Sequence, residues 1–248
     1  MDKKIVYTDI NKNNHEIKFY DLLESGHNMD KHIINGSLFH RLDHQFDMLI
    51  SLLKPGSVVY DVGSYIGTFS IPMAIEGMKL HAFEGFPDNY HRCVKNTKPY
   101  DVKNYLCAVS DKEYAVESKF NSCMDDGYEK KDNIKYYRLD DFIKYKSLPL
   151  PNLVKVDIEG METIAMHGMT NLIENIRPIW QMGYHYKFYS TLEGYPGWVD
   201  VKDGGYDFQN FDKLDYLIFD ERGIRQNPSI LHKRGGEFIF IPKEKIKK

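Results

Sequence analysis

The sequence predicts an α/β domain built on a mostly parallel β-sheet with an antiparallel C-terminal end. Between about residues 57 and 181, short apolar stretches of strand length alternate with helix-like segments. Several of these strands end in acidic or glycine-containing turns, as is usual at the carboxyl edge of a parallel sheet. Beyond residue 215 the strand-like segments follow one another without helices, which favours antiparallel pairing.

Length, charge and cysteine content define the class of protein. The chain has 248 residues, a formal net charge of −3 and 42% hydrophobic residues, which suits one large domain. The small negative charge gives no electrostatic reason to expect nucleic acid or an anionic membrane as a partner. The sequence contains no run of about 18 apolar residues, so we expect no transmembrane helix. Cys93, Cys107 and Cys123 lack paired spacing and residues 1–14 lack the apolar centre of a signal peptide, so we expect free thiols and a cytoplasmic protein.

An N-terminal extension and a helix precede the sheet. Residues 1–35 are polar, broken by Asn and Gly, and contain only short strand-like pieces at Ile5–Tyr7 and Glu16–Tyr20. We interpret them as an extension that packs on a single domain formed by residues 36–248. Apolar residues then recur at helical spacing from Leu38 to Leu53, where a Pro-Gly pair ends the helix.

The alternation then gives five strands. They are expected at Ser57–Asp61, Lys79–Glu84, Tyr105–Val109 and Leu153–Ile158, with a fifth that begins at Pro178–Gln181. Helices are expected after the first strand through about Ile75, at Pro87–Asn96, and after the fourth strand up to Gly168.

Two regions depart from this alternation. Before the fourth strand, the β-like stretches Ala115–Phe120 and Ile134–Leu139 predict a hairpin inserted near residues 114–139. Asp140 and Asp141 are expected to cap the short helix that follows. The C-terminal strands expected to pair antiparallel are Tyr216–Phe219 and Glu237–Ile241.

The first chemical signal is the segment VVYDVGSYIG. Asp61 ends a strand, Gly63 and Gly67 lie in the turn that opens the next helix, and Glu84 ends the following strand 23 residues after Asp61. Glycines at such a turn let the backbone approach a ligand, and an acid at that separation can accept from both hydroxyls of a ribose. The Gly-x-x-x-Gly spacing lacks the pyrophosphate fingerprint of dinucleotide enzymes. A cofactor with a ribose and no pyrophosphate fits better, although a tight strand-to-helix turn alone would also use these glycines.

These residues and four further segments resemble the FkbM-type S-adenosylmethionine-dependent methyltransferases. The similar segments are VVYDVGSYIG, HAFEGFPDNY, AVSD, RLDDF and NLVKVDIEGMETIAMHGM, which run in the family's order over about residues 38–185. The resemblance implies a class I (Rossmann-like) methyltransferase fold with a seven-stranded sheet. It also implies methyl transfer to oxygen, often on sugar or polyketide-like hydroxyls.

The resemblance assigns the cofactor site residue by residue. It implies that the amino-acid end of S-adenosylmethionine is held by Asp61, Gly63, Ser64 and Gly67, the ribose by Glu84, and the adenine by Phe86 and the turn at Ala108–Ser110. Asp157 is a further candidate for the cofactor site, because its carboxylate could accept from the cofactor's amino group. One position departs from the family, because Gln181 stands where the fifth strand commonly ends in an acid. A neutral amide cannot act as a base or as a charged metal ligand.

The segment NLVKVDIEGMET carries the second chemical signal. In an extended strand, Lys155, Asp157 and Glu159 share one face. We expect Lys155 to offset the charge of Asp157, because an unpaired carboxylate is costly to bury. The next acid, Glu162, is expected on the side of the following helix opposite its apolar stripe.

Three residues are candidates for catalysis. Asp157, Glu159 and His185 are expected near the transferred methyl, where one of them could orient an acceptor hydroxyl or remove its proton. The alternative is a structural network that caps the strand. The same residues with Glu162 could hold a hard cation, but no compact ligand motif supports this, so no metal is predicted. The aromatic segment 184–198 is either a substrate platform or a lid packed on the sheet edge.

Three functions follow from these observations. The leading one is an S-adenosylmethionine-dependent O-methyltransferase that acts on a small hydroxylated acceptor, with a sugar or glycan suspected. The alternative is a non-catalytic class I fold that serves as a cofactor-binding or assembly module. A nicotinamide-dependent oxidoreductase is disfavoured by the missing pyrophosphate motif. The sequence carries no signal for an oligomeric state.

Overall fold

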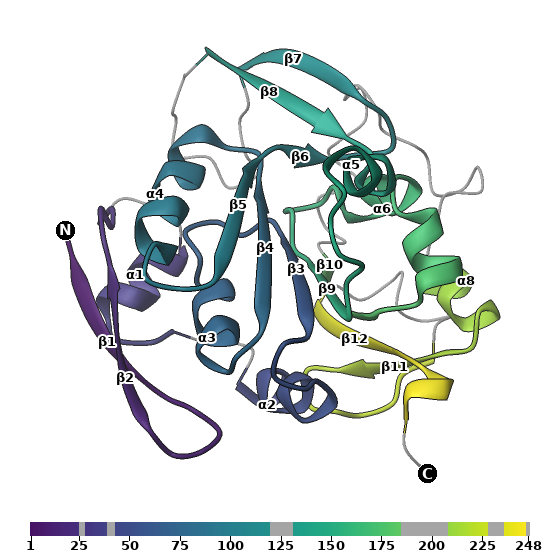
Figure 1. The fold of residues 1–248 in the computed structure, drawn as a ribbon, viewed down its shortest axis with the longest axis horizontal. Coiled ribbons are helices and arrows are strands. Elements are labelled where there is room, and N and C mark those ends of the chain that lie inside the picture. Colours follow the sequence, from purple (N-terminus) through teal and green to yellow (C-terminus); the bar gives the residue numbers. More distant parts are fainter. Residues whose placement is uncertain (25–27, 39–42, 120–130, 185–207, 228–235, 247–248) are drawn as a thin grey trace.

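A seven-stranded sheet forms the centre of the protein. The computed structural model describes residues 1–24, 28–38, 43–119, 131–184, 208–227 and 236–246. The strand order is β11-β12-β10-β9-β3-β4-β5 (Figure 1). The strands are β3 (Val58–Val62), β4 (Lys79–Glu84), β5 (Val102–Leu106), β9 (Leu153–Val156), β10 (Ile179–Tyr184), β11 (Tyr216–Asp220) and β12 (Gly236–Pro242). β10, β9, β3, β4 and β5 form a parallel sheet, and β12 runs antiparallel to both of its neighbours, β10 and β11, which confirms the predicted class I fold with its antiparallel end.

Helices cover both faces of the sheet because its central strands are apolar on both sides. Every residue of β9 and β10 is buried, the pattern of a parallel sheet enclosed between helices. The helices are α1 (Asn28–Ile34), α2 (Asp43–Leu52), α3 (Ser70–Ile75), α4 (Pro87–Thr97), α5 (Leu139–Lys146), α6 (Glu162–His167) and α8 (Phe208–Lys213), with a π-turn at Leu172–Ile176 and a 3₁₀ turn at Lys243–Lys245. One core cluster joins the sheet to α5, α6 and α8, and a second joins it to α2 and α3.

Two strands end elsewhere than predicted. The third strand was expected at Tyr105–Val109, but β5 ends at Leu106 and the chain turns at Cys107, whose N–H donates to the Glu84 carbonyl at 2.9 Å. Ala108–Val109 forms β6, which pairs with β8 (Lys131–Tyr137) in a separate sheet. β9 stops at Val156 instead of Ile158, and the turn that follows has left-handed backbone at Glu159 and Gly160.

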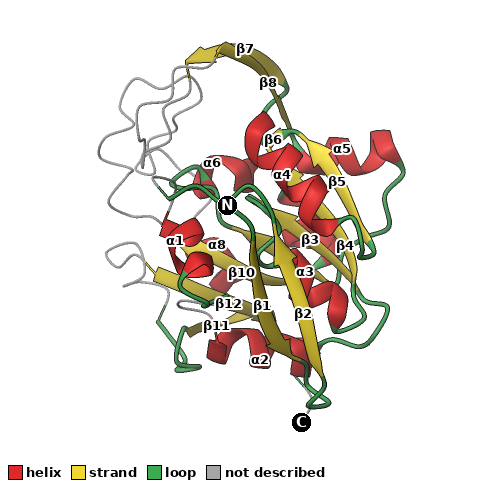
Figure 2. Cartoon of the chain, turned by 90° about the vertical axis from the view of Figure 1, so that its left-hand side faces the viewer, coloured by secondary structure: helices red, strands yellow, loops and turns green. Residues whose placement is uncertain are grey.

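β7 (Tyr114–Lys119) and β8 pair antiparallel and project from the upper end of the molecule (Figure 2).

Asp140 does not cap the helix α5 as the sequence predicted. Its carboxylate accepts from the backbone N–H groups of Asn171 and Leu172 at 2.8 and 3.1 Å. The acid therefore caps the π-turn rather than α5, a long-range contact that ties the two segments together.

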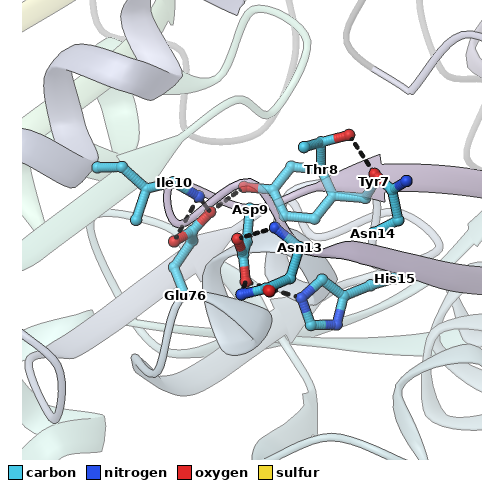
Figure 3. Close-up of polar contacts among 8 residues, drawn as sticks. All are labelled: Tyr7, Thr8, Asp9, Ile10, Asn13, Asn14, His15 and Glu76. Carbon is cyan, nitrogen blue, oxygen red and sulfur yellow. Dashed lines mark hydrogen bonds and ion pairs between the residues drawn. The ribbon is translucent and has the colours of Figure 1, made fainter.

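The N-terminal residues form a hairpin, β1 (Lys3–Thr8) and β2 (Asn14–Phe19), followed by α1 on the same side of the molecule as α4 and β5 (Figure 1). Its apolar side chains share a core cluster with α3. At the hairpin turn, Asp9 accepts from the Asn13 backbone N–H at 2.8 Å and contacts His15 Nε2 at 2.8 Å (Figure 3). Tyr7 Oη and the Ile10 N–H donate to Glu76, the residue after α3. These contacts attach the hairpin to the main sheet's helical layer.

Candidate functional site

The candidate site lies at the carboxyl edge of the parallel strands, where β3, β4, β9 and β10 all end. This edge is the usual ligand position in an open α/β sheet. Acids stand within one residue of the ends of three of these strands, at Asp61, Glu84 and Asp157. Asp61 is in register with Ala82 and Lys155. Glu84 and Asp157 therefore form a row at the edge of the sheet, and Asp61 lies two residues behind it.

Glu84 is held in place by the two turns that follow β3 and β4. Its Oε2 accepts from the Tyr65 N–H at 2.8 Å and its Oε1 accepts from the Phe86 N–H at 2.9 Å. Tyr65 has a left-handed backbone, with φ of 52°, which aims its N–H at the carboxylate. Burial raises the pKa of Glu84 to about 7 despite these two bonds. The carboxyl group is therefore pre-positioned, and its charge is sensitive to pH near neutrality.

Asp61 and Lys155 form a buried ion pair behind this row. Lys155 Nζ lies 3.1 Å from Asp61 Oδ1 and 3.8 Å from Asp157 Oδ2, and it donates to the Gly63 carbonyl at 2.7 Å. Ser70 donates to the other oxygen of Asp61 at 2.7 Å. Burial alone would lower the pKa of Lys155, but the charges of Asp61 and Asp157 outweigh it and raise the pKa. The sequence argument paired Lys155 with Asp157, whereas the structure makes Asp61 its nearer partner.

The turn glycines are required by contacts within the protein. Gly63 has φ of +80°, and a Cβ there would lie 1.9 Å from the backbone oxygen of Asp157. Gly67 has φ of +90°, and a Cβ there would lie 2.8 Å from Thr97 Cγ2. Both positions therefore need glycine for backbone conformation and close approach. From the sequence we expected these glycines to let a ligand approach, with a tight strand-to-helix turn as the alternative. For Gly63, the packing of the turn after β3 against the turn after β9 already requires glycine.

The remaining residues predicted to bind the cofactor fall into two groups. Ala108 packs against the residue between Glu84 and Phe86, because a Cβ at Gly85 would be 3.0 Å from Ala108 Cβ. Ser64 and Ser110 are almost fully buried, at 2% and 0% exposure. Their hydroxyl groups contact Cys93 Sγ at 3.6 Å and Asp111 Oδ1 at 3.0 Å. The structure thus brings Phe86 and Ala108 to Glu84, and it turns the two serines toward protein partners.

The turn after β9 differs from the predicted polar row. Asp157 continues the strand direction and donates its N–H to the Val62 carbonyl at 3.0 Å, with its side chain about one-third exposed (32%). Glu159 has a left-handed backbone with φ of 56°, so it leaves the two-residue alternation that was expected to place it beside Asp157. Glu162 was expected to face away from the core, but it is fully buried. Its carboxylate accepts from the N–H groups of Ile158 and Gly160 at 3.1 Å and thereby fixes the turn.

The structure adds Glu237 and Gly183, which the sequence did not single out. Glu237 is the second residue of β12 and lies opposite Gly183 of β10. A Cβ at Gly183 would lie 2.9 Å from Asp157 Oδ1 and 3.0 Å from Glu237 Oε1, so both carboxylates stand over this glycine. Gln181 Nε2 donates to Glu237 Oε2 at 2.7 Å. Its place near the start of β12 could have pointed to Glu237 from the sequence, because an antiparallel last strand begins at the edge where the parallel strands end.

Other predicted features lie outside the described residues. These are His185 and the aromatic segment 184–198, of which only Tyr184 is described, as a buried residue. Within the described ranges, no three His, Cys, Asp or Glu side chains are grouped so that they could hold a metal ion. No helix in the same ranges is long and apolar enough to cross a membrane.

Comparison with known proteins relates this site to methyl transfer. Residues 61–208 match the model of the methyltransferase FkbM domain. The hexuronic acid methyltransferase AglP of Haloferax volcanii is 28% identical over 136 residues, which cover 52% of this chain and 56% of that protein. The methyltransferase FkbM structure from Methylobacillus flagellatus has a TM-score of 0.51 at 18% identity, covering 77% of this chain and 45% of that one.

A TehB-like S-adenosylmethionine-dependent methyltransferase from Corynebacterium glutamicum also matches in structure. Its TM-score is 0.48 at 10% identity, and the match covers 87% of this chain and 95% of that one. The chain thus spans about half the length of the AglP and FkbM relatives that it matches.

Proposed function

Because the chain belongs to the FkbM family of S-adenosylmethionine-dependent methyltransferases, we propose that it transfers the methyl group to a hydroxyl of a small acceptor, with a sugar or glycan favoured. The observation that carries the proposal is the partly exposed Asp157 carboxylate at the sheet edge. It stands between the turn after β3 and Gly183, which the Glu237 carboxylate also approaches. The relative AglP, named for a hexuronic acid, supports a sugar acceptor.

The residues at this edge fit the cofactor. Two N–H donors hold the Glu84 carboxylate at the end of β4, where it can accept from both hydroxyls of a ribose. Phe86 and Ala108 lie beside it for the adenine ring. The turn containing Gly63 and Gly67 and the Asp157 carboxylate are proposed to hold the amino-acid end. Asp61 would act from behind this turn, since it is fully buried against Lys155.

The chain's own contribution to the reaction is position and proton acceptance. When bound, S-adenosylmethionine supplies an electrophilic methyl group on a sulfonium sulfur. Holding an acceptor oxygen in line with that methyl supplies most of the acceleration of such a displacement. Asp157 is the proposed proton acceptor, because a base needs only hydrogen-bond reach of the hydroxyl. Glu159 and His185 remain candidates for the same role.

The organisation and location of the chain are part of the proposal. We place the catalytic unit in residues 36–248, with residues 1–35 as an extension that contacts it through the β1–β2 hairpin and Glu76. A reducing, cytoplasmic location is supported by Cys93 and Cys107, which are free and buried. The proposed partner is a small hydroxylated molecule, with no role for nucleic acid or a membrane.

Calorimetric titration with S-adenosylmethionine tests the cofactor site. Glu84→Gln keeps side-chain shape and is expected to weaken binding at least tenfold, by loss of one charge-assisted contact (about 1.5–3 kcal/mol). Asp61→Asn is also expected to weaken binding, because it removes the charged partner of Lys155, which donates to the Gly63 carbonyl. Glu244→Gln is the matched control, since Glu244 pairs with Arg177 at the opposite end of β12. Wild-type affinity in both Glu84→Gln and Asp61→Asn would refute the assignment. Cofactor binding without methylation of any hydroxylated acceptor would favour the non-catalytic module.

A further inference from the structure

We propose that Glu237 binds the acceptor together with Asp157, and that this pair of carboxylates selects an alcohol hydroxyl, rather than a carboxylate, as the group that is methylated. The inference rests on the proposed methyl transfer and adds to it a residue from the last strand and a chemical class of acceptor group.

The two carboxylates converge on one position. Asp157 Oδ1 and Glu237 Oε1 lie 2.9 and 3.0 Å from the point where a Cβ of Gly183 would be. The two oxygens are therefore within about 6 Å of each other, a span that two neighbouring hydroxyls of a sugar can match by donating one hydrogen bond of about 2.7 Å to each carboxylate. Glycine at position 183 lets both carboxylates approach the backbone here, because a side chain would collide with them.

The position of Glu237 in the sheet assigns it to the acceptor. Glu84 ends β4, Asp61 is the last but one residue of β3, and Asp157 directly follows β9. β12 lies two strands beyond β9. At about 4.8 Å per strand, β12 is about 14 Å from β3. Glu237 thus stands on the side of Asp157 away from the proposed ribose site. A group that reaches both Asp157 and Glu237 approaches the site from the direction opposite the cofactor.

Gln181 positions the Glu237 carboxylate and adds a second acceptor beside it. Its Nε2 donates to Glu237 Oε2 at 2.7 Å. Its Oε1 is buried and has no hydrogen-bond partner among the residues that the structure describes. A buried amide oxygen of this kind normally has a partner in the working protein. A bound molecule that carries hydroxyl donors can satisfy the carboxylates and this oxygen, because all of them are acceptors.

The charge at this edge disfavours a carboxylate as the reacting group. In the described part of the chain, the cation in contact with Asp61 and Asp157 is Lys155, whose charge also interacts with Glu237. Three acids thus face one lysine that already contacts Asp61 and the Gly63 carbonyl. Among the described residues, a further carboxylate from the acceptor would meet the like charge of these three acids. A hydroxyl carries no charge and can donate to either acid.

The proposed reaction balances in atoms and charge. The hydroxyl oxygen forms a bond to the methyl carbon while the carbon–sulfur bond breaks, and that bond's electron pair stays on sulfur as a neutral thioether. The hydroxyl proton passes to a carboxylate of the pair and then to water. The product is a methyl ether, whereas methylation of a carboxylate would give a methyl ester.

A competition experiment tests both parts of the inference. The protein is given S-adenosylmethionine and an equimolar mixture of methyl hexopyranosides and the corresponding hexuronates. Products are compared before and after mild alkali, which cleaves esters and leaves ethers. We expect alkali-stable products, with kcat/KM for Glu237→Gln lowered roughly 10- to 100-fold, mainly through the acceptor KM. Gly183→Ala, which places a methyl group against both carboxylate oxygens, should act in the same direction.

Two controls separate acceptor binding from general damage. S-adenosylmethionine affinity should stay within about twofold in Glu237→Gln, since the two sites are distinct, and Glu244→Gln should behave as wild type. In saturation-transfer NMR on protein loaded with S-adenosylhomocysteine, hexopyranoside signals should be strong in the wild type and weak in Glu237→Gln. Alkali-labile products, or wild-type acceptor KM in Glu237→Gln, would overturn the inference and leave methyl transfer intact. Absence of any methylated sugar would overturn the sugar proposal and this inference together.

Discussion

Removing the charge of Lys155 tests the buried network that supports the site. The substitution Lys155→Met nearly keeps the length of the side chain. Among the described residues, it leaves the fully buried Asp61 carboxylate with the Ser70 hydroxyl as its side-chain hydrogen-bond donor. The variant also loses the 2.7 Å bond to the Gly63 carbonyl. Breaking one side of a buried ion pair costs about 3–5 kcal/mol, and the lost hydrogen bond adds about 1 kcal/mol. We therefore expect a loss of about 4–6 kcal/mol, a large part of the stability of an ordinary domain.

Protonation of Asp61 should reduce this cost at low pH. Burial already raises the pKa of Asp61, and without Lys155 the pKa rises further. A folded-state pKa above the unfolded value means that stability is present at low pH and is lost as pH rises through the folded pKa. The penalty of Lys155→Met should thus be smaller at about pH 6 than at about pH 8, by up to about 1.4 kcal/mol per pH unit.

Urea unfolding followed by circular dichroism measures this prediction. The double variant Asp61→Asn with Lys155→Met removes both charges, so it should be more stable than Lys155→Met alone. Lys243→Met is the matched control, because Lys243 forms an exposed pair with Asp215 and should cost less than about 1 kcal/mol. A loss of less than about 1 kcal/mol in Lys155→Met would contradict the buried ion pair. So would a double variant whose loss in free energy of unfolding equals the sum of the losses in the two single variants.

Three further predictions follow from single contacts. Affinity for S-adenosylmethionine should rise as pH increases through the Glu84 pKa of about 7, by up to about tenfold per unit below it; calorimetry should show no such trend in Glu84→Gln. Gly63→Ala should lower the free energy of unfolding by at least about 3 kcal/mol. Gly56 has a similar φ and no atom within 4 Å, so Gly56→Ala should lower it by only about 1–2 kcal/mol. Equal losses in urea unfolding would show that the contact at Gly63 does not matter. Glu162→Gln should cost about 2 kcal/mol and speed amide hydrogen exchange at Gly160, and unchanged exchange there would show that Glu162 does not hold the turn.

The sheet could be predicted because its signals are local. β4 begins and ends where the apolar run Lys79–Glu84 does, and α6 ends before Gly168 as expected. The third strand was misplaced because Leu106, Cys107 and Ala108 continue a β-like pattern through a turn. The turn depends on Cys107 pairing with the Glu84 carbonyl, and a contact between residues 23 positions apart leaves no periodic trace.

The site was only partly predictable for the same reason. Strand periodicity placed Asp157 at the edge, but it misplaced Glu159, because the left-handed backbone of that residue breaks the alternation. A helical pattern put Glu162 in solvent, whereas its carboxylate folds back to the N–H groups of the preceding turn. Glu237 meets Gln181 across 56 residues of sequence. Only the register of β10 with β12 brings these two side chains together.

The most direct test of the proposed function is the identity of the methylated product. The protein is incubated with S-adenosylmethionine labelled in its methyl group and a glycan extract, and the labelled product is isolated and solved by NMR and mass spectrometry. We expect one methyl ether on a sugar hydroxyl, formed by the wild type and greatly reduced in Glu84→Gln. Label found on nitrogen, on carbon or in an alkali-labile ester, or no labelled product at all, would contradict the proposed O-methylation of a hydroxyl.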